Sequence, residues 1–284
     1  DMIGSKLLFS GYGDGRYKRA HHAGLIGKDT LIVHDEAHLT PAFSELLRGI
    51  QAEQQRFREA RPIHVMELSA TSRGGDEAGR FSLLPEDEKD PIVPLRLDAN
   101  KELRLYEVED KKAMLFAMVE CAFAHDGKNC KVVVFVSSPD DAQKVVDGLT
   151  TKLKKHKDHV ALLTGTMRGY ERDLLVAENK VFRSMLGLDQ NDATVYLVST
   201  SAGEVGIDID GDHMVSDLTT LDAFIQRSGR VNRRGGKGRK AHVDLIAHTP
   251  KGNGGKKPEM ANDNEKARSD RWPTALLASF GHLK

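Results

Sequence analysis

Cysteine is scarce in this chain, which has only Cys121 and Cys130 among its 284 residues. Two thiols cannot build the disulfide framework of a small secreted protein, so the composition favours a reducing cytoplasm. Long hydrophobic runs are also lacking, because stretches such as VVVFV at residues 132–136 are far too short to cross a bilayer. The first twenty residues do not show the basic-then-apolar layout of a secretory signal. These absences argue against a secreted protein and against a membrane partner.

Aromatic residues and net charge are low as well. Phe, Trp and Tyr make up 6% of the chain, and 42 basic residues balance 42 acidic ones. Few aromatic rings predict little base stacking, so any nucleic-acid contact should be mainly to phosphates and independent of base sequence. The basic residues are nevertheless concentrated between residues 226 and 257, where ten of them stand against one acidic residue, a local net charge of +9 (10 − 1). This basic segment is a candidate DNA contact.

Apolar runs bounded by turn residues alternate with helical periodicity, which is the βαβ pattern of an α/β protein with parallel sheets. The expected strands are short and rich in aliphatic residues, and the expected helices are longer and amphipathic. In the first half we expect strands at 30–35 and 63–70 around a helix at 41–61, and in the second half helices at 111–125, 139–155 and 170–186 with strands at 131–138, 159–165 and 194–200.

The length of the chain favours two domains of ordinary size. Residues 73 to 112 are charged and interrupted by proline, which indicates one edge strand and a connection between domains. We therefore expect the later part of a first RecA-like domain at 1–98, a connection at 99–112, a second RecA-like domain at 113–250, and a polar linker with the start of an accessory segment at 251–284.

The stretch LIVHDEAHL at residues 31–39 places Asp35 and Glu36 at the end of an expected strand. Ligands of open α/β sheets bind beyond the carboxyl ends of the strands. A carboxylate pair there suits Mg²⁺ and an attacking water, the two requirements for splitting a phosphoanhydride. Two alternatives are a loop with no site and a zinc site. The zinc site is disfavoured because the residues do not form H-E-x-x-H and His34 should point to the face opposite Asp35.

Three further segments follow in order along the chain. SAT at residues 69–71 ends the next strand, and VSTSAGEVGIDID at 198–210 ends a strand of the second domain. QRSGRVNRRG at 226–235 places Arg230 and Arg233 three residues apart, which predicts one face of a helix. Arginine forks so placed suit a γ-phosphate, although a solvated basic face is the alternative.

With these segments in this order, the sequence resembles the superfamily 2 helicases, which have two RecA-like domains. DEAHL, SAT, LLTGTMRGYERD at residues 162–173 and above all QRSGRVNRRG resemble the helicase part of the CRISPR-associated helicase-nuclease of type I systems. GSKLLFSGYG and HAGLIGKDTLIVHDEAH are most similar to its type I-U (I-G) branch. The resemblance implies an ATP- and Mg²⁺-dependent motor on single-stranded DNA in antiviral defence, recruited by a guide-RNA surveillance complex and acting with a nuclease domain or subunit.

The resemblance also implies residue roles. Asp35 and Glu36 would hold Mg²⁺ and activate the attacking water, and Arg230 and Arg233 would face the γ-phosphate. The other residues are assigned by motif: Gly206, Asp208 and Gln226 at the nucleotide, His38, Ser69 and Thr71 in coupling hydrolysis to movement, and Thr164, Arg168, Thr200 and Glu204 at the nucleic acid.

The chain departs from the family in one respect. No G-x-x-x-x-G-K-[ST] occurs in it, and the nearest candidate, Gly27-Lys28-Asp29, ends in a carboxylate and precedes a strand. We therefore expect a fragment that lacks the phosphate-binding loop and the nuclease domain and that is inactive alone. A non-catalytic helicase-like scaffold module and a superfamily 2 helicase of another DNA-processing pathway remain as alternatives.

Overall fold

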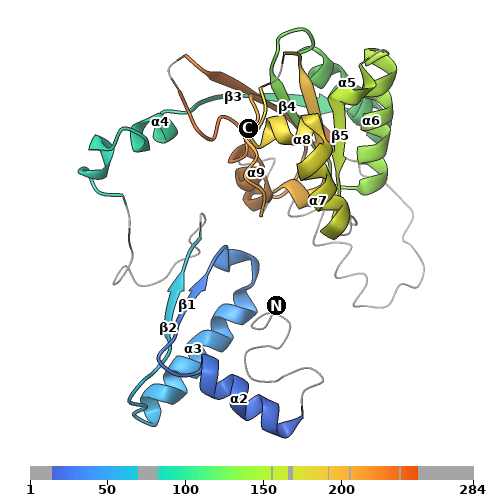
Figure 1. Ribbon diagram of the computed structural model, residues 1–284. Coiled ribbons are helices and arrows are strands. Elements are labelled where there is room, and N and C mark those ends of the chain that lie inside the picture. The colour runs from blue at the N-terminus through green and yellow to red at the C-terminus, as the bar shows by residue number, and fades with distance from the viewer. Residues whose placement is uncertain are drawn as a thin grey trace, which may run out of the picture. The chain divides into compact units, whose positions relative to one another are not determined.

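The computed structural model divides the chain into two units, Asp1–Ser82 and Leu83–Lys284, and each is treated by itself (Figure 1). Two predicted site residues, Thr71 and Arg168, and the tail at 251–284 lie outside the described residues. The structure describes residues 15–69, 81, 83–154, 156–165, 169–190, 192–204, 206–236 and 238–248.

The first unit contains two parallel strands, β1 (Leu31–His34) and β2 (His64–Glu67), joined by helix α3 (Pro41–Arg56). Parallel strands need such a crossover, and Pro41 suits the first turn of a helix because its missing N–H would be unpaired there. A second helix, α2 (Arg16–Ile26), precedes β1. The predicted strands and helix are confirmed, although α3 ends earlier than expected, ahead of Arg58 with its left-handed φ of 51°.

The core of the first unit is small. Ile26, Ile32, Leu47 and Ile63 are buried together between the two helices and one face of the sheet. Alternation along β1 buries Ile32 and His34 on that face and leaves Leu31 and Val33 exposed on the other. The turn after β1 therefore follows a strand that packs against the core on one face only.

The second unit is built on a six-stranded, entirely parallel sheet with strand order β3-β8-β7-β4-β6-β5. All carboxyl ends of the strands meet at one edge, which is where sites of such sheets lie. The strands are β3 (Asn100–Val108), β4 (Lys131–Phe135), β5 (Val160–Leu163), β6 (Val195–Ser199), β7 (His213–Asp217) and β8 (Lys240–His248).

Helices cover both faces of this sheet (Figure 1). On one face α5 (Lys111–Phe123) and α6 (Pro139–Leu153) pack against Val132, Val134 and other strand residues. On the other face α8 (Lys180–Met185) packs against residues that include Val133 and Phe135. Burial on both faces explains why the central strands are continuous aliphatic runs. The predicted α/β class with two parallel sheets is confirmed.

The segment 99–112 is not the expected connection between domains. Residues 100–108 form β3, which pairs with β8 along its whole length, from Asn100 opposite Lys240 to Val108 opposite His248. The division between the units lies instead at Ser82 and Leu83. β3 lies at the edge of the sheet, and because one side of an edge strand faces solvent, its charged sequence is easily taken for a linker.

The single helix expected at 170–186 is two helices. α7 (Gly169–Glu178) ends before Asn179, whose backbone is extended and whose side chain accepts the Phe182 N–H at 2.9 Å, capping α8. Asparagine at an N-cap competes with helix continuation in this way. Helix α9 (Leu221–Ser228) follows β7.

Two further expectations concern cysteine and hydrophobic length. Cys121 and Cys130 are both free thiols. Within the described ranges, the helices are all too short or too polar to span a membrane.

Candidate functional site

The acidic pair lies in a tight turn directly after β1. Glu36 has a left-handed backbone with φ of 51°, and its N–H donates to Asp35 Oδ1 at 2.9 Å. The turn is tied to the end of β2, because Ala37 N–H donates to the Leu68 carbonyl at 3.0 Å and Leu68 N–H to the His34 carbonyl at 2.9 Å. A non-glycine residue in this conformation is strained, and such strain is concentrated at functional sites. Both carboxylates therefore have fixed positions at the carboxyl edge of the sheet.

His38 connects this turn to the SAT segment. His38 Nδ1 lies 3.0 Å from Ser69 Oγ and 3.5 Å from Glu36 Oε2. Its side chain is 4% exposed and follows the turn in the short 3-10 helix Ala37–Leu39. Three residues predicted from two separate motifs, Glu36, His38 and Ser69, are thus brought into contact.

His34 belongs to the core rather than to a metal site. Its Nε2 lies 2.8 Å from Thr40 Oγ1, its Nδ1 lies 3.3 Å from Ser44 Oγ, and its ring meets Phe43 edge-on. The hydroxyl groups of Thr40 and Ser44 are hydrogen-bonded to the two ring nitrogens, and these contacts orient the start of α3. The ring points away from the Asp35 side, as strand alternation predicts, so the zinc alternative gains no support.

In the second unit, Thr164 and Thr200 follow neighbouring strands, β5 and β6. Thr200 N–H donates to the Leu163 carbonyl at 3.1 Å, so the two predicted nucleic-acid residues lie at adjacent strand ends. Both residues are buried, which leaves little of either hydroxyl at the surface. Gly206, predicted at the nucleotide, has a φ of 79°, a conformation that glycine adopts without strain.

Arg227 is a buried cation that binds three side chains, and it was not among the residues predicted from the sequence. Its Nε lies 2.7 Å from Glu204 Oε1, and its Nη1 lies 2.7 Å from Asp217 Oδ1 and 2.9 Å from Ser216 Oγ. The side chain is 3% exposed. A charge this buried must be paired, and here two carboxylates pair it. Its place beside Gln226 in QRSGR was the available signal, whereas the partner Asp217 could not be recognised locally.

Glu204 has a different environment from the one expected of a nucleic-acid contact. Its carboxylate is occupied by Arg227, and its backbone carbonyl accepts bonds from Arg230 Nε at 2.8 Å and Nη2 at 2.6 Å. Both arginines therefore converge on one residue at the end of β6. Glu204 positions the arginines of the motif, and Gln226 lies half-buried next to them.

Arg230 and Arg233 do not share a helix face, contrary to the prediction. α9 ends at Ser228, Val231 forms a β-bridge to Gly211, and Asn232 has a left-handed φ of 47°. The bridge and the turn replace the helical geometry that the spacing suggested. Arg230 is buried, whereas Arg233 is 45% exposed and pairs with Asp208 Oδ1 at 3.1 Å.

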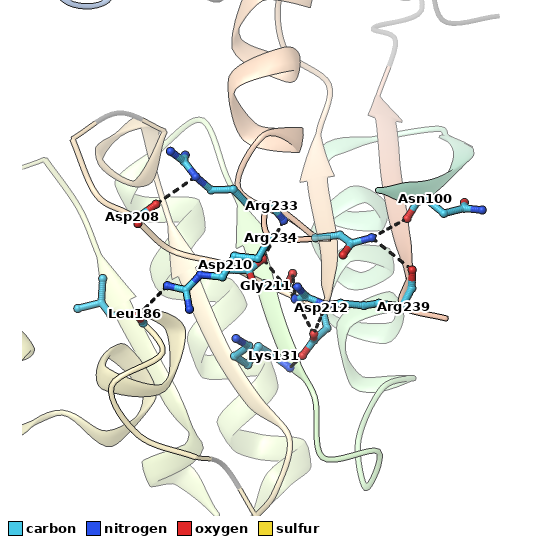
Figure 2. A network of polar contacts seen from close by, with 11 residues as sticks. Asn100, Lys131, Leu186, Asp208, Asp210, Gly211, Asp212, Arg233, Arg234 and Arg239 are labelled. Carbon is cyan, nitrogen blue, oxygen red and sulfur yellow. Dashed lines mark hydrogen bonds and ion pairs between the residues drawn. The ribbon is translucent and has the colours of Figure 1, made fainter. Parts of the chain in front are cut away.

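A second network fixes the backbone around Arg233 (Figure 2). Arg239 binds Asp210 Oδ2 at 2.8 Å and Asp212 Oδ1 at 2.7 Å, and the Arg233 N–H donates to Asp210 Oδ1 at 2.8 Å. Burial opposes the charge of Arg239, but the two carboxylates outweigh burial and raise the pKa of its guanidinium. The Asn232 amide adds bonds to the Asn100 and Arg239 carbonyls at 3.0 and 3.4 Å.

These networks correct the expectation for the basic segment. Arg227, Arg230 and Arg239 are bound to acidic side chains or to a carbonyl of the chain itself. The local net charge of +9, counted along residues 226–257, therefore overstates the charge presented to a polyanion.

The residues fit the groups that the resemblance to helicases implies. Asp35 is exposed, and the Glu36 N–H orients its carboxylate, the kind of oxygen ligand that Mg²⁺ takes. Arg233 and Arg230 are the guanidinium groups that suit phosphate oxygens. Asp208, beside Arg233, is exposed at the same loop.

Comparisons with known proteins concern the fold and the segment 128–236. Residues 128–236 match the family model for the C-terminal part of the CRISPR-associated nuclease/helicase Cas3. A comparison with curated proteins finds no match. Among solved structures, the T. fusca Cas3-ATP crystal structure is 17% identical, with 89% of this chain and 33% of that chain covered and a TM-score of 0.56. The DUF1998 helicase MrfA bound to DNA and AMPPNP is 18% identical, with 78% and 31% covered and a TM-score of 0.54.

These likenesses define the fold. The chain spans about a third of the length of T. fusca Cas3 and of MrfA. At such identities the structural match concerns the fold alone, and the family match concerns residues 128–236. The chain therefore has the RecA-like helicase fold of Cas3, and its residues 128–236 are similar to the C-terminal part of that CRISPR-associated nuclease/helicase.

Proposed function

We propose that this chain is part of an ATP- and Mg²⁺-dependent motor that moves along single-stranded DNA in a CRISPR interference system. The observation that carries the proposal is the contact of His38 with both Ser69 and Glu36, at 3.0 and 3.5 Å. It joins the acidic turn to the next motif as a hydrolysis site coupled to movement requires. The family match of residues 128–236 supports the CRISPR context.

The chain's own residues divide the chemistry between them. Glu36, held by its turn, takes the proton of the attacking water. Asp35 is the carboxylate that would hold Mg²⁺, which when bound supplies positive charge against the phosphate oxygens. Arg233 reaches phosphate by exchanging only an exposed pair with Asp208, whereas Arg230 acts from a buried position fixed by Glu204.

Coupling to DNA is the second part of the proposal. A change at Glu36 reaches the SAT segment through His38 and Ser69. In the second unit, Glu204 links the arginines to the strand ends that carry Thr164 and Thr200. We propose that a guide-RNA surveillance complex recruits the motor and that a nuclease domain or subunit acts with it, in the cytoplasm that the free Cys121 and Cys130 suit.

A second candidate is a non-catalytic scaffold with a helicase fold. It is favoured by the lack of G-x-x-x-x-G-K-[ST] within the 284 residues, since that loop cradles the β- and γ-phosphates. A third candidate, a superfamily 2 helicase of another pathway, is compatible with the fold similarity to MrfA. The paired and strained acidic turn favours the motor.

The test compares this chain with a polypeptide that carries it together with a phosphate-binding loop. We expect no ATP turnover from the chain alone and DNA-stimulated turnover from the longer polypeptide. Glu36→Gln in the longer polypeptide should abolish phosphate release while ATP binding persists, because the amide keeps the shape but cannot take the proton.

Glu45→Gln, a change on the exposed side of α3, is the matched control and should keep full turnover. Turnover of Glu36→Gln near that of the unchanged protein would reject Glu36 as the base. Binding of single-stranded DNA without any turnover in the longer polypeptide would favour the scaffold.

A further inference from the structure

Three histidines meet in the second unit at the amino ends of the strands. His125 follows α5, His213 is the first residue of β7, and His242 lies near the start of β8. One ring nitrogen from each lies within 4.8 Å of the others. The rings of His125 and His213 are stacked with centroids 3.9 Å apart, and the His213 and His242 rings are 5.2 Å apart. The amino ends of the strands thus carry a cluster that the proposed motor does not use.

Two buried polar atoms at this cluster have no hydrogen-bond partner among the described residues. They are Nδ1 of His125, which is 4% exposed, and Oδ1 of Asp244, which is 2% exposed. Buried polar atoms are almost always paired, so each unpaired atom needs an explanation, and a bound ion would be one. Both residues line one cavity of about 280 Å³, together with Cys121 and His242.

The neighbouring sequence positions reinforce the convergence. Cys121 lies in the last turn of α5, four residues before His125, and Asp244 follows His242 by two residues on β8, so His242 and Asp244 lie on one strand face. The lining of the cavity therefore combines imidazole, thiol and carboxylate groups. Imidazole and thiol groups suit zinc and its neighbours in the first transition series rather than Mg²⁺.

We propose that His125, His213 and His242 bind one divalent transition-metal ion, with Zn²⁺ the ion that the ligand types favour. Asp244 is the carboxylate placed to complete or orient the ligand set. The imidazoles of His125 and His213 are neutral, as metal ligands must be. Burial, and next the neighbouring His213, lower the pKa of His125 to about 3. Burial, and next the neighbouring His242, lower the pKa of His213 to about 4. Neutral rings keep a lone pair for the metal.

Binding requires two existing contacts to change. Arg104 Nη2 lies 3.1 Å from His242 Nε2, and the His242 N–H donates to His213 Nδ1 at 3.1 Å. Zinc–nitrogen bonds of about 2.0 Å in a tetrahedral site also bring the ligand nitrogens closer than they are here. Arg104 is partly exposed and is also bound to Glu102 at 3.0 Å, so it can leave His242 without losing every partner. The arginine and the metal therefore compete for the same imidazole.

The experiment uses the full chain, without a polyhistidine tag, after treatment with EDTA. Co²⁺ replaces Zn²⁺ as the probe because it reports nitrogen-rich tetrahedral sites by its visible absorption. We expect one equivalent of Co²⁺ to produce these bands, Zn²⁺ to displace it, and Zn²⁺ to raise the unfolding temperature. His242→Ala, which keeps the backbone N–H bond to His213, should weaken binding at least about tenfold and abolish the temperature shift.

The chain provides a matched control in His156, Asp158 and His159, a second group of possible ligands that is more exposed. His159→Ala should leave the Co²⁺ bands unchanged. Arg104→Ala, which removes the competing cation and no ligand, should tighten Co²⁺ binding. The proposal is overturned if the unchanged chain gives no bands, if His159→Ala removes them, or if they persist at full strength in His242→Ala. Should His242→Ala not fold by circular dichroism, weaker or unchanged binding in Arg104→Ala overturns it.

Discussion

Arg227 Nη1 lies 2.7 Å from Asp217 Oδ1 in the interior of the second unit, at the point where β7 ends and α9 returns to it. The same guanidinium lies 2.7 Å from Glu204 Oε1, so one cation joins two segments that each end a strand. Because the three side chains are nearly enclosed, the arrangement resists separation. It places Arg227 against the carboxyl end of β7.

Arg227→Ala should lower the free energy of unfolding by about 3–5 kcal/mol, because it leaves two buried carboxylates without their cation. Urea unfolding followed by circular dichroism measures the loss. Arg233→Ala, at an exposed position three residues after Arg230, is the control and should change stability by less than about 0.5 kcal/mol. Equal effects of the two substitutions would show that the buried ion pairs of Arg227 add no stability beyond that of an exposed arginine.

The two candidate arginines should separate in a combined measurement of turnover and stability. In a polypeptide that carries a phosphate-binding loop, Arg233→Ala should reduce DNA-stimulated ATP turnover by about 10³-fold with an unchanged unfolding temperature. Arg230→Ala should reduce turnover and also cost about 1–3 kcal/mol, since it removes both donors to the Glu204 carbonyl. Arg234→Ala, at the adjacent arginine, should leave turnover unchanged. Full activity of Arg233→Ala would make its loop a basic surface only.

Two glycines in helices should respond oppositely to alanine. A Cβ at Gly148 of α6 would lie 2.8 Å from Val119 Cγ2 of α5, whereas a Cβ at Gly49 of α3 would meet nothing within 4 Å. Val119 is β-branched and buried, so it yields poorly. Gly148→Ala should destabilise by about 1–3 kcal/mol despite its better helix propensity, and Gly49→Ala should stabilise by up to about 1 kcal/mol. Urea unfolding of both variants measures the two changes in the free energy of unfolding. Stabilisation by Gly148→Ala would contradict the expected clash with Val119.

Stability should depend on acid through Asp141, which lies 2.6 Å from Lys111 Nζ and 3.1 Å from Lys144 Nζ. Burial raises the pKa of this carboxyl, but the two ammonium groups outweigh burial and hold the pKa below its usual value. The folded state therefore binds fewer protons than the unfolded one, and the stabilisation present above about pH 4 is lost as the pH falls further.

Asp141→Asn should cost about 1–2 kcal/mol at pH 7 and reduce the acid dependence below pH 4. The free energy of unfolding measured from pH 7 to pH 3 tests this. Asp140→Asn, at the exposed neighbouring position, is the control. If the acid dependence of stability is unchanged in Asp141→Asn, the contacts of Asp141 with Lys111 and Lys144 are not its cause.

Binding of single-stranded DNA by this chain should weaken steeply with salt, although less than its sequence suggests. Ten phosphate contacts would give a slope of log K against log salt near −7, and seven would give about −5. Because Arg227, Arg230 and Arg239 are engaged internally, we expect no slope steeper than about −5. Fluorescence anisotropy across a salt series measures the slope. A slope near −7 would show that these arginines exchange their partners for DNA.

The sequence alone determined what depends on nearby residues. Hydrophobic periodicity predicted β1, α3 and the central strands of the second unit, because burial on one or both faces produces a regular pattern of apolar residues along the sequence. The position of Asp35 and Glu36 at the end of a strand was predicted for the same reason, whereas the tight turn that holds them was not. The resemblance to helicases also came from short motifs.

Only the tertiary structure decided the relations between distant residues. β3 reads as a linker until β8, about 140 residues later, pairs with it. The helix expected to carry Arg230 and Arg233 ends early because Val231 bridges to Gly211, and Arg227 acquires its carboxylates from two other segments. The histidine cluster likewise draws on residues 125, 213 and 242. The free energy of such contacts depends on burial and on partners brought together by folding, and no local window of sequence contains both.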